Sequence, residues 1–73
     1  MALITRYTVR IRTADRGPGD LPGFLDMLRY DNPRVEGWEQ TEDGLRITLL
    51  FLDRPPTIER WQSFGLYPQE VSR

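Results

Sequence analysis

Hydrophobic and polar residues alternate from Leu3 to Thr13 near the start of the chain. The side chains that share the more apolar face are Leu3, Thr5, Tyr7, Val9 and Ile11. The side chains on the opposite face are Ile4, Arg6, Thr8, Arg10 and Arg12. A period of two with β-branched residues is typical of a strand that is buried on one face. We therefore expect a strand over residues 3–13 that turns its arginines away from the core.

A helical pattern follows a loop at residues 14–19 that contains glycines and a proline. The apolar residues with helical spacing are Leu21, Phe24, Leu25 and Leu28. Their spacing predicts a helix that ends near Tyr30. Asp20 is placed to accept a hydrogen bond from a free backbone N–H at the helix start. Pro33 ends the helix, because the residue before a proline is pushed out of the helical conformation.

Two extended segments, residues 35–41 and 45–53, flank the sequence Glu42-Asp43-Gly44. An Asp-Gly pair between extended segments favours a hairpin, since glycine adopts the positive φ that such turns require. In the second segment the residues expected to face the core are Leu45, Ile47, Leu49 and Phe51. In the first segment Gly37 indicates a β-bulge.

A second helix is expected after the prolines at 55 and 56. The apolar residues at three-residue spacing are Ile58, Trp61 and Phe64. Gly65 stands at the position that follows a helix, and Leu66 is placed to fold back on the last turn. Residues 66–73 contain a proline and form either a short edge strand or a loose end.

The expected order of elements is β-α-β-β-α, with a possible short fourth strand. This order fits a ferredoxin-like fold, with two helices on one face of an antiparallel sheet. Residues 1–73 are expected to form a single small α+β domain, because a chain of this length has room for only one core.

The composition excludes several kinds of chemistry. The chain has neither cysteine nor histidine, so disulfides, thiol nucleophiles and Cys/His zinc sites are impossible. Ser63 and Ser72 have no histidine to activate them. The carboxylates around the hairpin fit no calcium-loop spacing; they are Glu36, Glu39, Glu42 and Asp43. We therefore expect no enzyme activity, no cofactor and no metal site.

The charge distribution bears on partners and location. All ten basic residues are arginine, which reflects either genomic base composition or selection at an interface, and the net charge is −1. A chain without a basic field is not expected to bind nucleic acid, and its outward strand positions lack the aromatics that stack RNA bases. No apolar run is long enough to cross a membrane, and the first residues lack the pattern of a signal peptide. We expect a cytoplasmic protein.

The most informative surface is the outward face of the expected sheet. A small domain without disulfides or metal is commonly stabilised by association, which points to a protein partner or a homodimer. An arginine-rich rim around apolar residues is typical of a protein interface. The residues expected to bind a partner are Arg6, Arg10, Arg12, Arg46, Leu50 and Leu52, joined by Trp38 if its strand turns it outward. In the alternative reading the arginines form cross-strand ion pairs with residues such as Glu36.

The edge of the first strand offers a second docking mode. Without a fourth strand its backbone N–H and C=O groups are unpaired and would accept a partner strand. The surface and the edge lead to the same main hypothesis, a non-catalytic protein-binding module that acts as a small regulator or inhibitor.

A short segment resembles a known family. Residues 15–19, Asp-Arg-Gly-Pro-Gly, and residues 22–28, Pro-Gly-Phe-Leu-Asp-Met-Leu, resemble the loop and first helix of ACT-type regulatory domains. The resemblance implies a dimeric sensor of small molecules such as amino acids, with Gly19 or Gly23 letting the ligand approach the backbone. A more remote hypothesis is a small dimeric enzyme that relies on carboxylates and tyrosines.

Overall fold

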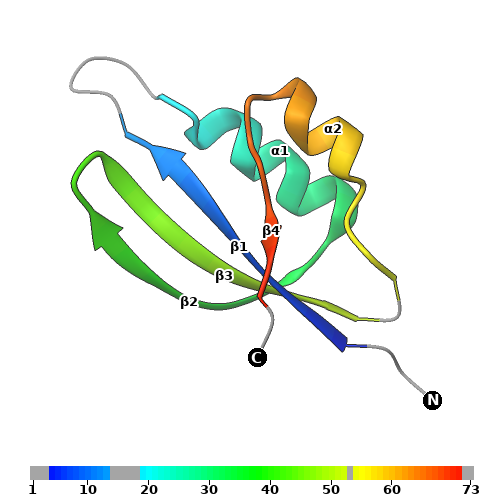
Figure 1. Cartoon of the computed structure of the whole chain (residues 1–73). Coiled ribbons are helices and arrows are strands. Elements are labelled where there is room, and N and C mark those ends of the chain that lie inside the picture. Colours follow the sequence, from blue (N-terminus) through cyan, green and yellow to red (C-terminus); the bar gives the residue numbers. More distant parts are fainter. Residues whose placement is uncertain (1–3, 14–18, 53, 72–73) are drawn as a thin grey trace.

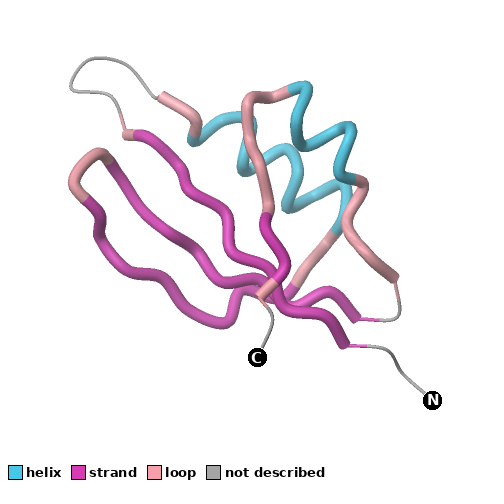
Figure 2. The backbone as a smooth tube through the Cα atoms, in the orientation of Figure 1, coloured by secondary structure: helices cyan, strands magenta, loops and turns pink. Residues whose placement is uncertain are grey.

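A computed structural model of the protein describes residues 4–13, 19–52 and 54–71, with four strands and two helices. The elements are β1 Ile4–Arg12, α1 Leu21–Asp31, β2 Arg34–Thr41, β3 Gly44–Leu52, α2 Ile58–Ser63 and β4 Gln69–Glu70. The strands form one sheet in the order β2-β3-β1-β4, and all neighbours are antiparallel. Both helices lie on one face of this sheet, and the described chain leaves the other face uncovered (Figures 1 and 2).

The coarse prediction of a small α+β protein with an antiparallel sheet and two helices is confirmed. The expected hairpin joins β2 to β3, and the expected bulge appears as a register shift between Val35 and Gly37. The tail forms a two-residue strand, in which Gln69 lies opposite Thr8 and Glu70 opposite Tyr7. β1 is therefore flanked on both sides over part of its length. Neither α1 nor α2 has the length and apolar character of a helix that crosses a membrane.

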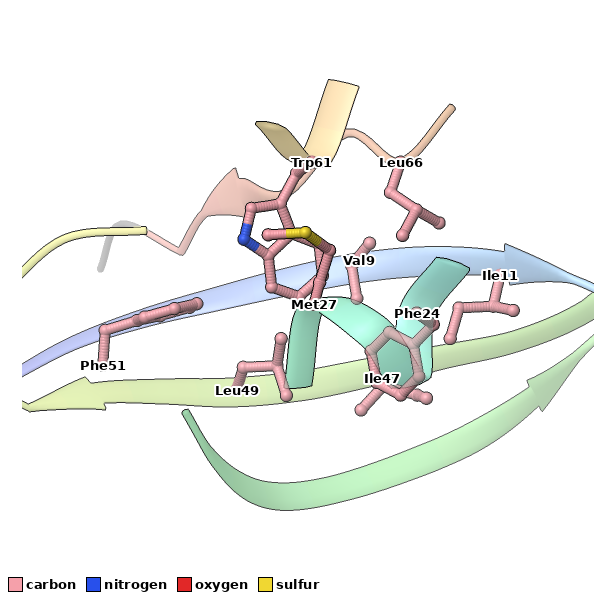
Figure 3. Close-up of a cluster of buried hydrophobic side chains, with 9 residues drawn as sticks. All are labelled: Val9, Ile11, Phe24, Met27, Ile47, Leu49, Phe51, Trp61 and Leu66. Carbon is pink, nitrogen blue, oxygen red and sulfur yellow. The ribbon is translucent and has the colours of Figure 1, made fainter. Parts of the chain in front are cut away.

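A cluster of buried hydrophobic side chains fills the space between the sheet and the helices (Figure 3). Its members are Val9, Ile11, Phe24, Met27, Ile47, Leu49, Phe51, Trp61 and Leu66. The ring of Trp61 meets Phe24 and Phe51 edge-on, with centroid distances of 6.1 and 6.3 Å. The strand residues in this cluster are those that the alternation predicted to face inward, so the period-two pattern placed the core correctly.

The end of α2 follows the predicted geometry. Gly65 has a φ of +79°, and its N–H donates to the carbonyl of Gln62. The N–H of Leu66 donates to the carbonyl of Trp61, and the Leu66 side chain is fully buried. This pair of hydrogen bonds satisfies carbonyls that the helix end would leave free and turns the chain back toward the sheet.

The expected helix cap at Asp20 is wrong. The Asp20 side chain makes no capping hydrogen bond to α1. Instead its Oδ2 accepts hydrogen bonds from the backbone N–H and the Nε of Arg12, at 3.0 and 3.3 Å. The backbone N–H of Asp20 also donates to the Arg12 carbonyl at 2.9 Å. The Asp20 carboxylate thus binds the end of β1 instead of the helix N–H groups, and Asp20 links the start of α1 to the sheet.

Asp31 joins the two helices, a role that the sequence did not reveal. It is the last residue of α1 and is only 7% exposed. Its carboxylate accepts hydrogen bonds from the Thr57 N–H (2.9 Å), the Thr57 hydroxyl (3.0 Å) and the Trp61 Nε1 (2.7 Å). These donors satisfy the buried charge and hold the start of α2 against the end of α1.

Candidate functional site

The face of the sheet opposite the helices carries most of the residues that the sequence suggested for partner binding. Residues opposite each other in an antiparallel pair lie on the same face. Because Val9 and Ile11 are buried under the helices, the alternate residues of β1 and their partners on β3 point outward. The suggested residues on this outer face are Arg6, Arg10, Arg12, Arg46, Leu50 and Leu52.

Trp38 does not belong to this outer face. The register pairs it with Ile47, which is buried on the helix side of the sheet. The bulge adds one residue before Gly37 and so reverses the face on which the following side chains lie. Trp38 lies on the helix side at the edge of the sheet, and 67% of its surface is exposed. The suggested binding residues therefore do not form one surface.

The outer-face arginines of β1 and β3 have intramolecular carboxylate partners. Arg6 donates two hydrogen bonds to Glu36, from Nε at 2.7 Å and from Nη2 at 3.1 Å. The other pairs are Arg10 with Asp43 at 3.2 Å, Arg12 with Asp20 at 3.3 Å, and Arg46 with Glu39. The structure thus contains the cross-strand ion pairs of the alternative reading. Exposed pairs of this kind contribute little to stability, because solvent screens the charges.

These pairs shift the pKa values of the groups involved. The hydrogen bond from Arg6 is the main cause that holds the pKa of Glu36 below its ordinary value, and it raises the pKa of Arg6. The hydrogen bond from the Thr41 hydroxyl is the main cause that lowers the pKa of Asp43, with a smaller effect of Arg10. Both carboxylates are therefore anionic at neutral pH, a state suited to charge pairing and not to proton donation.

One end of the outer face is apolar. Ile4 lies opposite Leu52, and Leu50 lies opposite Arg6. The N–H of Val71 donates to the Arg6 carbonyl, which places Val71 beside this end of β1. We call the set Ile4, Leu50, Leu52 and Val71 the outer patch. Exposure is 60% for Ile4, 48% for Leu52 and 41% for Val71, so the patch offers apolar surface from three adjacent segments.

One arginine borders the outer patch and another lies within it. Arg34 of β2 lies opposite Leu50, on the same face, and so stands at the β2 margin of the patch. Among the residues that the structure describes, no carboxylate lies within ion-pair distance of Arg34. Arg6 lies between Leu50 and Val71, with Glu36 as its ion-pair partner. The patch therefore combines exposed apolar side chains with one arginine that is paired and one at the margin.

The edge of β1 is less open than the sequence suggested. β4 pairs with Tyr7 and Thr8, and Asp20 occupies both backbone groups of Arg12. Between them, a hollow of about 420 Å³ lies next to Arg10 and is lined by Thr8, Arg10, Arg46, Tyr67 and Gln69. The space left on this edge is too short for a partner strand of ordinary length, because Asp20 and β4 block either side.

The two glycines of the ACT-type resemblance lie in different settings. Gly19 is exposed with a φ of +59°, next to residues 14–18, which lie outside the described residues. Gly23 lies within α1, and a Cβ built on it would be 3.1 Å from the Cβ of Phe64. Gly23 therefore allows the helices to approach each other. Ligand binding at either glycine stays a prediction.

The groups that could serve catalysis or metal binding lie at separate places in the molecule. The Ser63 hydroxyl donates to the Arg60 carbonyl at 2.6 Å, while Ser72 lies outside the described residues. Burial, with a smaller effect of Glu70, raises the pKa of Tyr7, so its hydroxyl stays protonated at neutral pH. Within the described chain no group of three or more acidic residues could hold a metal ion.

Comparisons with known proteins identify no relative. No protein-family description, no curated protein and no solved structure matches this chain.

Proposed function

We propose that the protein is a non-catalytic protein-binding module whose outer patch docks on a protein partner. The observation that carries the proposal is the shared exposure of Ile4, Leu52 and Val71 on one uncovered sheet face. A surface that combines exposed apolar side chains with arginines is typical of protein recognition. Binding without chemistry suits a small regulator or inhibitor, and we assign the protein to that class.

The shape of the surface favours a macromolecule over a small ligand. The hollow at the outer patch has a volume of about 200 Å³. Pockets for drug-sized ligands usually have about 300–1,000 Å³ and enclose most of the ligand. A protein surface gains more, because it covers all four apolar side chains at once. Each buried Leu, Ile or Val side chain contributes about 1.5–3 kcal/mol before the costs of association.

The charges around the patch indicate the chemistry of the partner. Arg34 borders the apolar side chains, and Arg6 lies among them with its charge balanced by Glu36. A partner with apolar side chains and a carboxylate facing Arg34 would satisfy both features, since an Arg fork binds a carboxylate through two hydrogen bonds. Nucleic acid is disfavoured, because the outer face presents no aromatic side chain from β1 or β3 for stacking.

We also assign the architecture to the ferredoxin-like class. Two features support this assignment. β3 lies between β1 and β2, and β1 lies between β3 and β4, so each helix connects two strands that are separated by a third. Interleaved β-α-β units of this kind are the hallmark of the split arrangement.

The test uses a single attachment point far from the outer patch. The chain contains no cysteine, so Glu42→Cys at the hairpin turn provides one site for coupling to a resin. We expect the resin to retain one protein from a host lysate in near-stoichiometric amount. Leu52→Arg in the same background should reduce the retained amount at least about tenfold, since a charge then replaces an apolar contact.

Gln62→Arg on the exposed side of α2 is the matched control, because it adds the same charge away from the patch. This variant should retain as much partner as the parent, and circular dichroism should show that both variants are folded. Equal retention by Leu52→Arg and the parent would exclude the outer patch as the binding surface.

A further inference from the structure

A second exposed apolar surface lies on the helix side of the sheet, along β2. We call its residues Leu21, Leu25, Val35 and Trp38 the side strip. Their exposed fractions range from 40% for Leu21 to 67% for Trp38. Val35 lies opposite Leu49, and Trp38 opposite Ile47, so both β2 side chains continue the buried layer beyond the helices. The hydrophobic core is therefore open at this side of the molecule.

The helix residues of the side strip lie on the flank of α1 that faces away from α2. Gly23 contacts Phe64, and the Arg60 guanidinium lies 4.2 Å above the ring of Tyr30, so these residues define the flank next to α2. At about 100° per residue, Leu21 and Leu25 point to the opposite flank. Because α2 leads to β4 at the far side of the sheet, this opposite flank is on the side of β2 (Figure 1).

β2 also has an open backbone edge. It is the outermost strand, and among the described residues only β3 pairs with it. The Thr13 N–H donates to the carbonyl of Asp43, so the odd-numbered residues of β3 form their backbone hydrogen bonds with β1. The even-numbered residues of β3 therefore form theirs with β2. The β2 residues that lie opposite odd-numbered residues of β3 direct their N–H and C=O groups to the open edge of the sheet. These outward-bonding residues are Val35, Trp38 and Gln40.

We propose that two copies of the chain associate through β2. The β2 strands of the two copies pair antiparallel, across a two-fold axis that passes between Glu36 and Gly37. In this register Val35 lies opposite the partner's Trp38, and Arg34 lies opposite the partner's Glu39. The two sheets become one continuous sheet, and the side strips of both copies meet beneath it.

The register satisfies three independent conditions. Val35 and Trp38 lie on the helix side and Arg34 and Glu39 on the outer side, so each opposed pair shares a face. Val35 and Trp38 are also two of the three residues with edge-directed backbone groups; the third, Gln40, lies opposite the partner's Pro33. Arg34 has no carboxylate partner among the described residues of its own chain, and the partner's Glu39, which also pairs with its own Arg46, would supply one.

Several other registers fail on the same criteria. A slip of one residue opposes Arg34 with Trp38 or Gln40, whose side chains lie on the other face of the sheet. An axis through Glu39 brings two carboxylates together, which is destabilising. An axis through Val35 opposes Arg34 with the partner's Glu36, but it leaves Trp38 opposite the partner's Asn32, which lies outside β2. A strand that can match itself fits a second copy better than an unrelated peptide, since a two-fold interface must be self-complementary.

The first test uses charge exchange between copies. Sedimentation equilibrium from micromolar to millimolar concentration should show a monomer–dimer equilibrium for the parent. Arg34→Glu and Glu39→Arg should each raise the dimer dissociation constant at least about tenfold, because each homodimer then has like charges opposed. An equimolar mixture of the two variants should restore association, since every opposed pair in the heterodimer is again of opposite sign.

Leu52→Arg on the outer patch should leave the dimer unchanged, which separates this proposal from the proposed function. A parent that stays monomeric at every concentration would overturn the proposal. Two single variants that associate as well as their mixture would overturn it as well.

The second test fixes the register. Arg34 and the partner's Glu39 form a non-hydrogen-bonded pair, whose Cα atoms lie about 4.5 Å apart, within the range of about 4.4–6.8 Å for disulfides. Because the chain has no cysteine, a mixture of Arg34→Cys and Glu39→Cys should form a cross-linked heterodimer on mild oxidation, and neither variant alone should. Cross-linking of Arg34→Cys with itself, or none in the mixture, would exclude this register.

Discussion

At the scale of single residues, Asp31 shows how one buried carboxylate organises a small protein. Two of its three donors come from Thr57, which directly precedes α2, and the third comes from Trp61 within α2. No basic residue forms an ion pair with Asp31 in the described chain. The three hydrogen bonds therefore offset the free-energy cost of removing this side chain from water. Removal of the carboxylate would leave the buried indole N–H of Trp61 without its acceptor, which is costly in the core.

We therefore expect Asp31→Ala to lower the free energy of unfolding by about 3 kcal/mol. Asp31→Asn should cost less, because its amide oxygen still accepts one or two of these hydrogen bonds. Asp26→Asn on the exposed side of α1 is the control and should change stability by less than about 0.5 kcal/mol. Urea titration followed by tryptophan fluorescence measures all three. A cost for Asp31→Ala as small as that of the control would contradict the role of Asp31.

Two glycines of the hairpin make a second residue-scale comparison. A Cβ on Gly44 would lie 1.9 Å from the carbonyl oxygen of Ile11, whereas a Cβ on Gly37 meets no atom within 4 Å. Gly44→Ala must therefore push β3 away from β1, and we expect a loss of about 3 kcal/mol or more. Gly37→Ala should be neutral or stabilise by up to about 1 kcal/mol, because it restricts the unfolded chain. Thermal unfolding of the Gly44→Ala and Gly37→Ala variants would test this difference in stability. Similar unfolding midpoints for the two variants would contradict the close packing at Gly44.

At the scale of elements, the ion pairs between strands make the sheet sensitive to acid. The folded-state pKa of Glu36 is lowered by Arg6, and that of Asp43 by Thr41 and Arg10. Below the ordinary carboxyl pKa of about 4 the unfolded chain binds more protons than the folded chain. The stability that these groups contribute is therefore present above that pH and is lost as the pH falls through their folded-state pKa values.

We expect the urea midpoint of the parent to fall as the pH is lowered from neutral to below about 4. Glu36→Gln should be less stable at neutral pH and should lose less between neutral and acidic pH, since one of the shifted carboxyls is gone. Glu59→Gln on α2 is a control that leaves the strand pairs intact. The same acid-induced loss in Glu36→Gln and the parent would contradict a contribution from this pair.

The elements also show which features a sequence can reveal. The alternation in β1 and β3 identified the inner and outer faces correctly, because a regular strand has a strict period of two. Gly37 correctly indicated a bulge, but a sequence does not show which residue is the extra one, and this decides the face of Trp38. Asp20 and Asp31 bind residues of other elements, so their partners become visible only when the helices are placed on the sheet.

At the scale of the whole molecule, the two exposed apolar surfaces lie on different sides of the sheet. The outer patch faces away from the helices, while the side strip continues the core beyond β2. A dimer through β2 would bury the side strip and leave two outer patches on the same face of the continuous sheet. Such a dimer would engage a partner with two matching sites more tightly than a single copy does, provided that both sites can be reached at once.

The same dimer makes stability depend on protein concentration. Association that occurs only in the folded state adds free energy by mass action, so each tenfold rise in concentration should stabilise the dimer by about 1.4 kcal/mol. We expect the urea midpoint of the parent to rise when the protein concentration is raised a hundredfold. In Arg34→Glu the midpoint should rise less over the same range, because the dimer of that variant dissociates more readily. A parent midpoint that does not move with concentration would show that β2 does not join two copies, and the side strip would then be a surface that the folded monomer leaves in contact with water.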